Sequence, residues 1–133
     1  GIRDYKVTGV QTCALPIFGN NESNEKIAMT SPVVMDMGTN RNMYFMVPKN
    51  YTRSTLPNPN DRNIDMITKS KHRVAAITFS GWADESKIQK HIQELKAILD
   101  KEGIKHTNKF QFMGYNPPYE LVNRRNEVVV EIL

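Results

Sequence analysis

Methionine and histidine side chains are the groups in this chain with the clearest capacity to hold a ligand. The chain has seven methionines and three histidines, and the methionines are concentrated between Met29 and Met46. Thioether and imidazole groups can line an apolar pocket or bind a transition metal. Flexible methionines can equally fill gaps in a core, and the residues alone leave both interpretations open.

The three histidines, His72, His91 and His106, do not form a metal-binding motif. No two of them have the spacing of metal ligands, so a purpose-built metal site is not predicted. His91 borders the apolar stripe of a predicted helix, His106 follows the end of that helix, and His72 lies in a basic loop. Each is expected at the surface or at the boundary of the core.

The basic residues could contact an acidic ligand. The formal net charge is +4, and its densest parts are the run 69–73 and the pair Arg124 and Arg125. No basic stripe with aromatic platforms is visible, so nucleic-acid binding is not predicted. Guanidinium groups fit carboxylates well, so both arginines are candidate ligand contacts. They could also anchor the last strand through hydrogen bonds and ion pairs, and we favour this structural role for the segment from Arg125 to Glu127.

The sequence contains no catalytic constellation. It has no G-x-S-x-G, no phosphate-binding glycine loop and no H-E-x-x-H motif. The single cysteine, Cys13, excludes an internal disulfide framework and a thiolate metal cluster. No apolar run reaches the roughly 18 residues of a transmembrane helix. These features favour a binding domain over an enzyme.

Short strands and one helix must position these residues. Alternating apolar residues predict strands at 26–37, 41–47, 64–67, 72–81, 109–113, 119–122 and 127–133. Pro32 predicts an edge, a bulge or a break in the first of these. Large apolar residues on both faces of 41–47 predict a strand that is covered on both sides. The layout indicates an α+β domain of antiparallel strands crossed by one helix.

The helix is predicted to run from Asp84 to Glu102. Its apolar residues recur at spacings of four, three and four, which places them on one face: Ile88, Ile92, Leu95 and Leu99. Asp84 and Glu85 favour a helix N-terminus, and Gly103 is suited to the C-terminal cap.

Several segments resemble, in order, the motifs of the SOUL haem-binding family. They are KIAMTSPV at 26–33, the strand 43–48 followed by LPNPN at 56–60, FSGW at 79–82, GYNPP at 114–118 and RRNEV at 124–128. The resemblance implies a distorted antiparallel β-barrel built from two similar halves, each with a long helix. Only the second of these helices is predicted here.

The resemblance also implies that the chain binds haem or another tetrapyrrole. The residues that we expect to contact the cofactor are Met35, Tyr44, Met46, Leu121, Arg124 and Arg125. His91 and His106 are the candidate iron ligands. In the family the pocket lies largely against the first helix, and an axial histidine proposed for some members lies in that half. Neither feature has a counterpart here.

The segment from Val7 to Ile17 stands where the first helix of the family should be. It resembles the translation of a sequencing-library adapter, and we therefore expect it not to be native sequence. The flanking segments 1–6 and 17–20 resemble the opening strand and a later piece of the same half. Residues 1–133 are predicted to form a single SOUL-like domain.

The expected function is tetrapyrrole binding without catalysis, as a carrier, buffer or sensor. The alternatives are an enzyme that removes iron or modifies the macrocycle, and a ligand- or partner-binding interaction module. The amino-acid sequences of the 81–84 and 114–118 segments resemble those of bacterial members of the family. The sequence is compatible with a cytoplasmic or a periplasmic location.

Overall fold

The computed structural model describes residues 2–7, 19, 21–27, 30–116 and 120–133, with side chains described from residue 19 onward. The described elements are β1 (Ile2–Val7), β2 (Val33–Asp36), β3 (Met43–Met46), β4 (Ile64–Lys69), β5 (Val74–Ser80), α1 (Glu85–Lys101), β6 (His106–Gly114) and β7 (Arg125–Ile132). They divide between two compact units. The first unit comprises 1–33 and 41–71, and the second comprises 34–40 and 72–133.

In the first unit, β1 is the central strand of an antiparallel sheet. It pairs with β3 on one side and with β4 on the other, so that Tyr5 lies opposite both Phe45 and Met66. The core of this unit consists of Ile27, Phe45, Leu56 and Ile64. Tyr44, on the opposite face of β3 from Phe45, is also buried. The prediction that this strand is covered on both sides is therefore confirmed.

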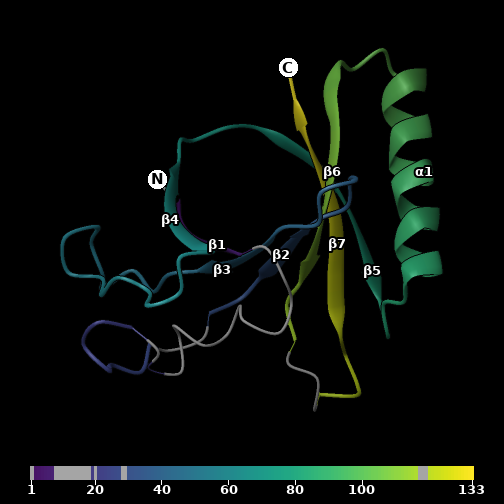
Figure 1. The fold of residues 1–133 in the computed structure, drawn as a ribbon. Coiled ribbons are helices and arrows are strands. Elements are labelled where there is room, and N and C mark those ends of the chain that lie inside the picture. Colours follow the sequence, from purple (N-terminus) through teal and green to yellow (C-terminus); the bar gives the residue numbers. More distant parts are fainter. Residues whose placement is uncertain (1, 8–18, 20, 28–29, 117–119) are drawn as a thin grey trace. The chain divides into compact units, whose positions relative to one another are not determined.

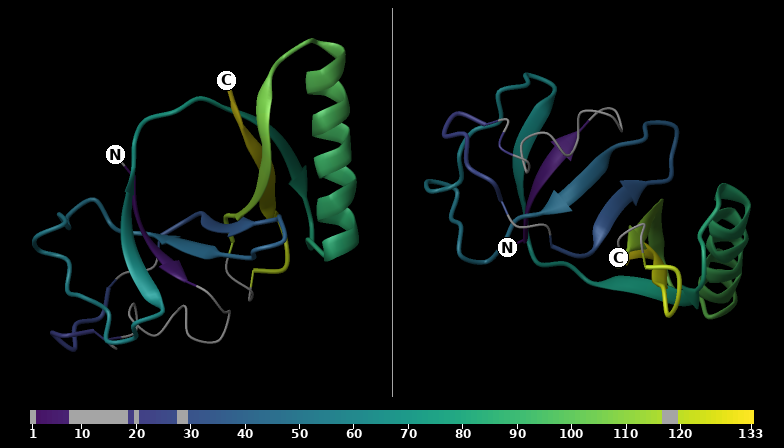
Figure 2. Two further views of the ribbon diagram at one scale, coloured as in Figure 1. Left: turned by 45° about the horizontal axis from the view of Figure 1, so that its top comes forward. Right: turned by 90° about the horizontal axis from the view of Figure 1, so that it is seen from below.

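In the second unit, β7 is paired antiparallel with β6 and β5, and β2 lies next to β6. One face of β5, β6 and β7 is covered by α1, which runs alongside these strands (Figures 1 and 2). Val128 and Val130 point to this face and are 0% and 1% exposed. They pack with the buried stripe of the helix, which consists of Ile88, Ile92, Leu95 and Leu99. The apolar spacing in the sequence thus predicted the buried face correctly.

The helix begins and ends close to the predicted residues. The Asp84 side chain caps the first turn by accepting a hydrogen bond from the Lys87 amide at 2.7 Å. Gly103, just past the C-cap, has a φ of +67°, a left-handed conformation that glycine adopts without strain. The predicted α+β class with one helix is confirmed for the described residues.

Other expectations have different outcomes. Within each unit the strands form an open sheet, so neither unit forms a closed barrel by itself. Three or four strands are too few to enclose a filled interior.

The prediction of a strand at 119–122 is wrong for the residues of this segment that the structure describes, because residues 120–122 are irregular. The β2 strand begins at Val33, directly after Pro32, as expected of a strand break. Residues 8–17 of the adapter-like segment lie outside the described residues.

In the described part of the chain, α1 is too short and too polar to cross a membrane, and no other helix is found there.

Candidate functional site

Three strand ends of the second unit meet at one edge of its sheet and carry the residues of the candidate site. The register places Asn126 opposite both Phe79 and Gly114, and Ser80 opposite Arg125. The end of β5, the end of β6 and the start of β7 therefore come together. The turns that leave these strands hold Trp82, Asn116 and the segment 120–124 close to the same edge.

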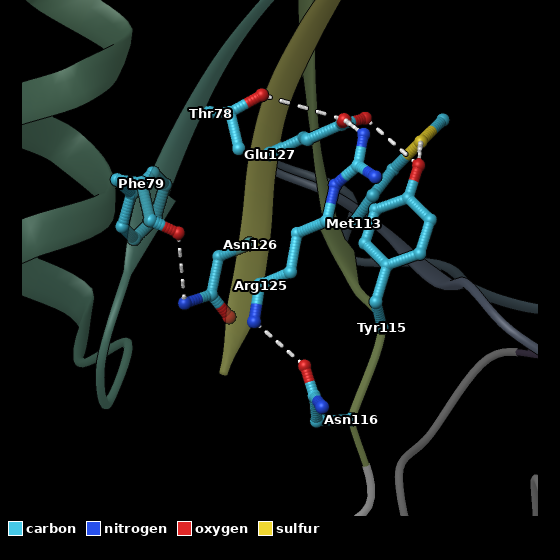
Figure 3. A network of polar contacts seen from close by, with 8 residues as sticks. All are labelled: Thr78, Phe79, Met113, Tyr115, Asn116, Arg125, Asn126 and Glu127. Carbon is cyan, nitrogen blue, oxygen red and sulfur yellow. Dashed lines mark hydrogen bonds and ion pairs between the residues drawn. The ribbon is translucent and has the colours of Figure 1, made fainter. Parts of the chain in front are cut away.

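A buried carboxylate, that of Glu127, forms the centre of a polar network on the face of the sheet away from α1 (Figure 3). Its oxygens accept hydrogen bonds from Arg125 Nη2 at 2.5 Å, from the Tyr115 hydroxyl at 2.8 Å and from Thr78 Oγ1 at 3.4 Å. Burial alone would raise the pKa of Glu127, but these hydrogen bonds outweigh it and hold the pKa below its usual value. The carboxylate is therefore ionised and bonded on both oxygens.

The two larger donors of the network are themselves held in place. The Arg125 guanidinium lies 4.8 Å above the Tyr115 ring, and its hydrogen bond to Glu127 raises the pKa of Arg125. Burial, with the hydrogen bond to Glu127, raises the pKa of Tyr115 to about 12. Arg125 thus has the geometry of the strand-anchoring role that we favoured from the sequence.

The raised pKa of Tyr115 gives a direct test of this network. Its phenol should ionise with a midpoint near pH 12 rather than near the ordinary value of 10.0. Because the folded-state pKa is raised, the contribution of this phenol to stability is fully present below pH 10 and is lost as the pH rises through about 12. The measurement is the difference in phenolate absorbance between the wild type and Tyr115→Phe during alkaline titration. A midpoint near 10 would show that the hydroxyl is neither buried nor bonded to Glu127 as the structure places it.

Hydrogen bonds between side chains and the backbone hold the turns at this edge. The buried Asn126 side chain donates to the carbonyls of Gly81 at 2.8 Å and of Phe79 at 3.4 Å. Gly81 has a φ of +86°, which a residue with a Cβ rarely adopts, so glycine is required for this turn. The Asn116 side chain accepts from the Arg125 amide at 2.6 Å. These bonds fix the positions from which Trp82 and Arg124 project.

Arg124 lies against an exposed tryptophan, in a segment that carries two further exposed apolar residues. The Arg124 guanidinium lies 4.7 Å above the Trp82 ring and donates to the Glu120 carbonyl at 2.7 Å. Trp82 is 60% exposed, and Leu121 and Val122, which follow Glu120, are each 76% exposed. We call Trp82, Leu121, Val122 and Arg124 the outer patch. Large exposed apolar groups beside a cation are typical of a surface that binds a ligand or a partner.

The other residues predicted to contact a cofactor lie elsewhere. Met35 is partly buried against the helix-covered core of the second unit. This position agrees with a gap-filling role in the core, one of the two interpretations that the sequence left open for the methionines. Tyr44 and Met46 belong to the first unit, two residues apart on one face of β3. Tyr44 is buried with the Lys69 ammonium 4.5 Å from its ring centre. Of the other predicted residues, Leu121 and Arg124 lie in the irregular segment 120–124, and Arg125 is the first residue of β7.

The two candidate iron ligands differ in their surroundings. His91 is half-buried in α1, where its ring stacks on Phe79 with a centroid distance of 4.0 Å. His106 bonds the amide of Asn108 through Nδ1 and faces the Asp100 carboxylate through Nε2 at 3.3 Å. His106 also lines an open pocket of about 430 Å³ at the C-terminal end of the helix, together with Asp100, Gly103, Ile104, Lys105 and Leu133. No cluster of three or more metal-binding side chains occurs among the described residues.

Sequence reasoning did not identify Trp82 as a site residue, although it lay inside a family motif. The available signal was a lone tryptophan between a strand and a helix cap, outside the apolar alternation of either element. Glu127 was expected only as part of a strand-anchoring segment. Its contacts with Tyr115 and Thr78 depend on strand register, which the sequence does not specify.

Comparisons with known proteins point to one family. A family profile described as "SOUL heme-binding protein" matches residues 4–131. Heme-binding protein 1 of Xenopus tropicalis is 28% identical over 120 residues, covering 84% of this chain and 63% of the relative. Heme-binding protein 2 of Homo sapiens is 27% identical over 121 residues, covering 84% of this chain and 58% of the relative. The chain therefore spans about three-fifths of the length of these curated relatives.

Proposed function

Because the chain belongs to the SOUL heme-binding protein family, we propose that it binds haem or a related tetrapyrrole, as a carrier, buffer or sensor without catalysis. The relatives named above are described as heme-binding proteins, which supports the ligand class. The observation that carries the proposal is the outer patch, where a cation lies directly beside exposed apolar side chains.

The chemistry of the outer patch fits a tetrapyrrole. The macrocycle is flat and apolar, and its carboxylates are confined to one edge. Trp82 offers an exposed aromatic face, and Leu121 and Val122 offer further apolar surface that a macrocycle would remove from water. The Arg124 guanidinium donates from its two terminal nitrogens to the carbonyls of Glu120 and Asn116, and it would supply the positive charge for a carboxylate at the edge of the macrocycle. When bound, haem supplies an iron centre and a strong visible absorbance.

We assign the two arginines different roles in this proposal. Arg124 contacts the ligand, while Arg125 positions the turn through its ion pair with Glu127 and through the hydrogen bond that its backbone amide donates to Asn116 Oδ1. The assignment of Met35, Tyr44 and Met46 as further cofactor contacts stays a prediction. Tyr44 and Met46 are the more favourable of the three, because they share one face of β3, whereas Met35 packs against a core.

Trp82 is the only tryptophan of the chain, so its fluorescence reports on this surface. We expect haem to quench this fluorescence with a saturable dependence on concentration. Arg124→Gln should raise the Kd about tenfold, because a hydrogen bond between charged groups contributes roughly 1.5–3 kcal/mol and part of that is retained by glutamine. The matched control is Arg73→Gln, an exposed arginine of the same unit, which should leave the Kd unchanged.

Two results would contradict this proposal in different ways. An unchanged Kd in Arg124→Gln, with saturable binding by the wild type, would place the ligand away from the outer patch. Quenching that rises without saturation would show that haem adsorbs non-specifically, and the proposed function would then be wrong.

A further inference from the structure

His91 lies at the border between the buried stripe of α1 and solvent. Its neighbours along the helix, Ile88 and Ile92, are both buried in the core of the second unit. The imidazole lies nearly parallel to the Phe79 ring, with 9° between the ring planes and 4.0 Å between their centres. One face of the imidazole is therefore covered by an aromatic ring, and its orientation is fixed by packing.

The hydrogen bond of His91 determines which nitrogen carries a lone pair. Nδ1 lies 2.7 Å from the carbonyl oxygen of Lys87. A carbonyl can only accept, so Nδ1 carries the hydrogen, and in the neutral imidazole Nε2 has the lone pair. Histidines that bind metals commonly use this arrangement, in which one nitrogen donates to a carbonyl and the other coordinates the metal.

The stacking on Phe79 does not obstruct coordination. A metal approaches an imidazole nitrogen within the plane of the ring, whereas Phe79 covers the face of the ring. None of the described residues makes a hydrogen bond to Nε2. Phe79 and the Lys87 carbonyl therefore hold the ring in place and leave its coordinating edge available.

His106 has the opposite arrangement. Its Nδ1 accepts the hydrogen of the Asn108 amide at 3.1 Å, so in the neutral ring the hydrogen is on Nε2, which faces Asp100 Oδ1 at 3.3 Å. Its side chain is only 9% exposed. Coordination by His106 would require the loss of one of these two interactions and a movement of the ring out of its buried position.

We propose that His91, through Nε2, ligates the iron of a haem carried by this chain. This inference rests on the proposed tetrapyrrole binding and adds the identity of the ligating residue. Phe79, on which His91 stacks, lies near the end of β5, and Trp82 follows in the turn that leads to α1.

The test compares ferric haem spectra of the wild type, His91→Ala and His106→Ala. The wild type and His106→Ala should share the Soret and visible bands of a nitrogen-ligated iron. His91→Ala should lose those bands and bind haem at least about tenfold more weakly, since even the loss of a residue that orients a ligand costs about 10- to 100-fold. Added imidazole should restore the bands in His91→Ala, because it can occupy the vacated space.

Nitrogen NMR of the ligand-free wild type provides a second measurement that does not depend on the folding of a variant. It should show the hydrogen of His91 on Nδ1, and a hydrogen on Nε2 of the neutral ring would overturn the proposal. Haem bound with identical spectra in the wild type and His91→Ala would also overturn it while leaving the proposed function intact. Failure of the wild type to bind haem at all would overturn both.

Discussion

Replacing Leu95 by alanine is expected to lower the free energy of unfolding by about 2–5 kcal/mol, the range for leucine-to-alanine changes in well-packed cores. Leu95 is 4% exposed and lies in the stripe through which α1 packs on Val128 and Val130. Its removal leaves a cavity between the helix and the sheet that rigid strands cannot fill. Urea denaturation followed by circular dichroism measures the change.

The matched control is Ile98→Ala on the same helix. Ile98 is 48% exposed, so its truncation should change the free energy of unfolding by no more than about 0.5 kcal/mol. Similar losses in both variants would mean that α1 does not present the described face to the sheet. The candidate site would then lose its support, because the Phe79 ring and the β7 strand both belong to this packed layer.

The second large effect is expected for Glu127→Ala. This change removes the acceptor of three hydrogen bonds and leaves the donors of Tyr115 and Thr78 in a partly buried setting. We expect a loss of about 1–3 kcal/mol of unfolding free energy, the cost of leaving buried groups without a partner. The value stays below that of a fully buried ion pair because the Arg125 side chain is 59% exposed and regains water.

The pH dependence isolates the charge of Glu127. Because hydrogen bonds depress its pKa in the folded state, its contribution to stability is present above the ordinary carboxyl pKa of 4.5 and is lost as the pH falls through the folded-state value. Glu127→Gln should remove this part of the acid destabilisation, and Glu131→Gln, at an exposed position of the same strand, should not. Parallel pH profiles for the wild type and Glu127→Gln would contradict the network.

Local patterns in the sequence predicted the helix most accurately. The spacing of its apolar residues and the acidic residues Asp84 and Glu85 at its start are properties of neighbouring residues, and α1 follows them closely. Strand bounds were less accurate, since β6 begins at His106 rather than at 109. Its first residues pair with the end of β7 across an irregularity between His106 and Phe110, which no local alternation indicates.

The candidate site could be predicted only in part. Arg124 and Arg125 were recognised as carboxylate-binding groups, but their sequence does not tell which one binds Glu127. The structure separates them: Arg125, at the start of β7, bonds Glu127, whereas Arg124 lies above Trp82. Trp82 was missed because its importance comes from a contact with a residue distant in the sequence. The histidine tautomers likewise depend on hydrogen bonds that require coordinates.

The most direct test of the central claim is a titration of this chain with haem, followed through the Soret absorbance over time. We predict saturable binding in the micromolar range, with a spectrum that does not change after equilibrium is reached. Absence of saturable binding would contradict the assignment of a tetrapyrrole binder. Progressive loss of the haem spectrum would contradict the non-catalytic role and indicate an enzyme that acts on the macrocycle.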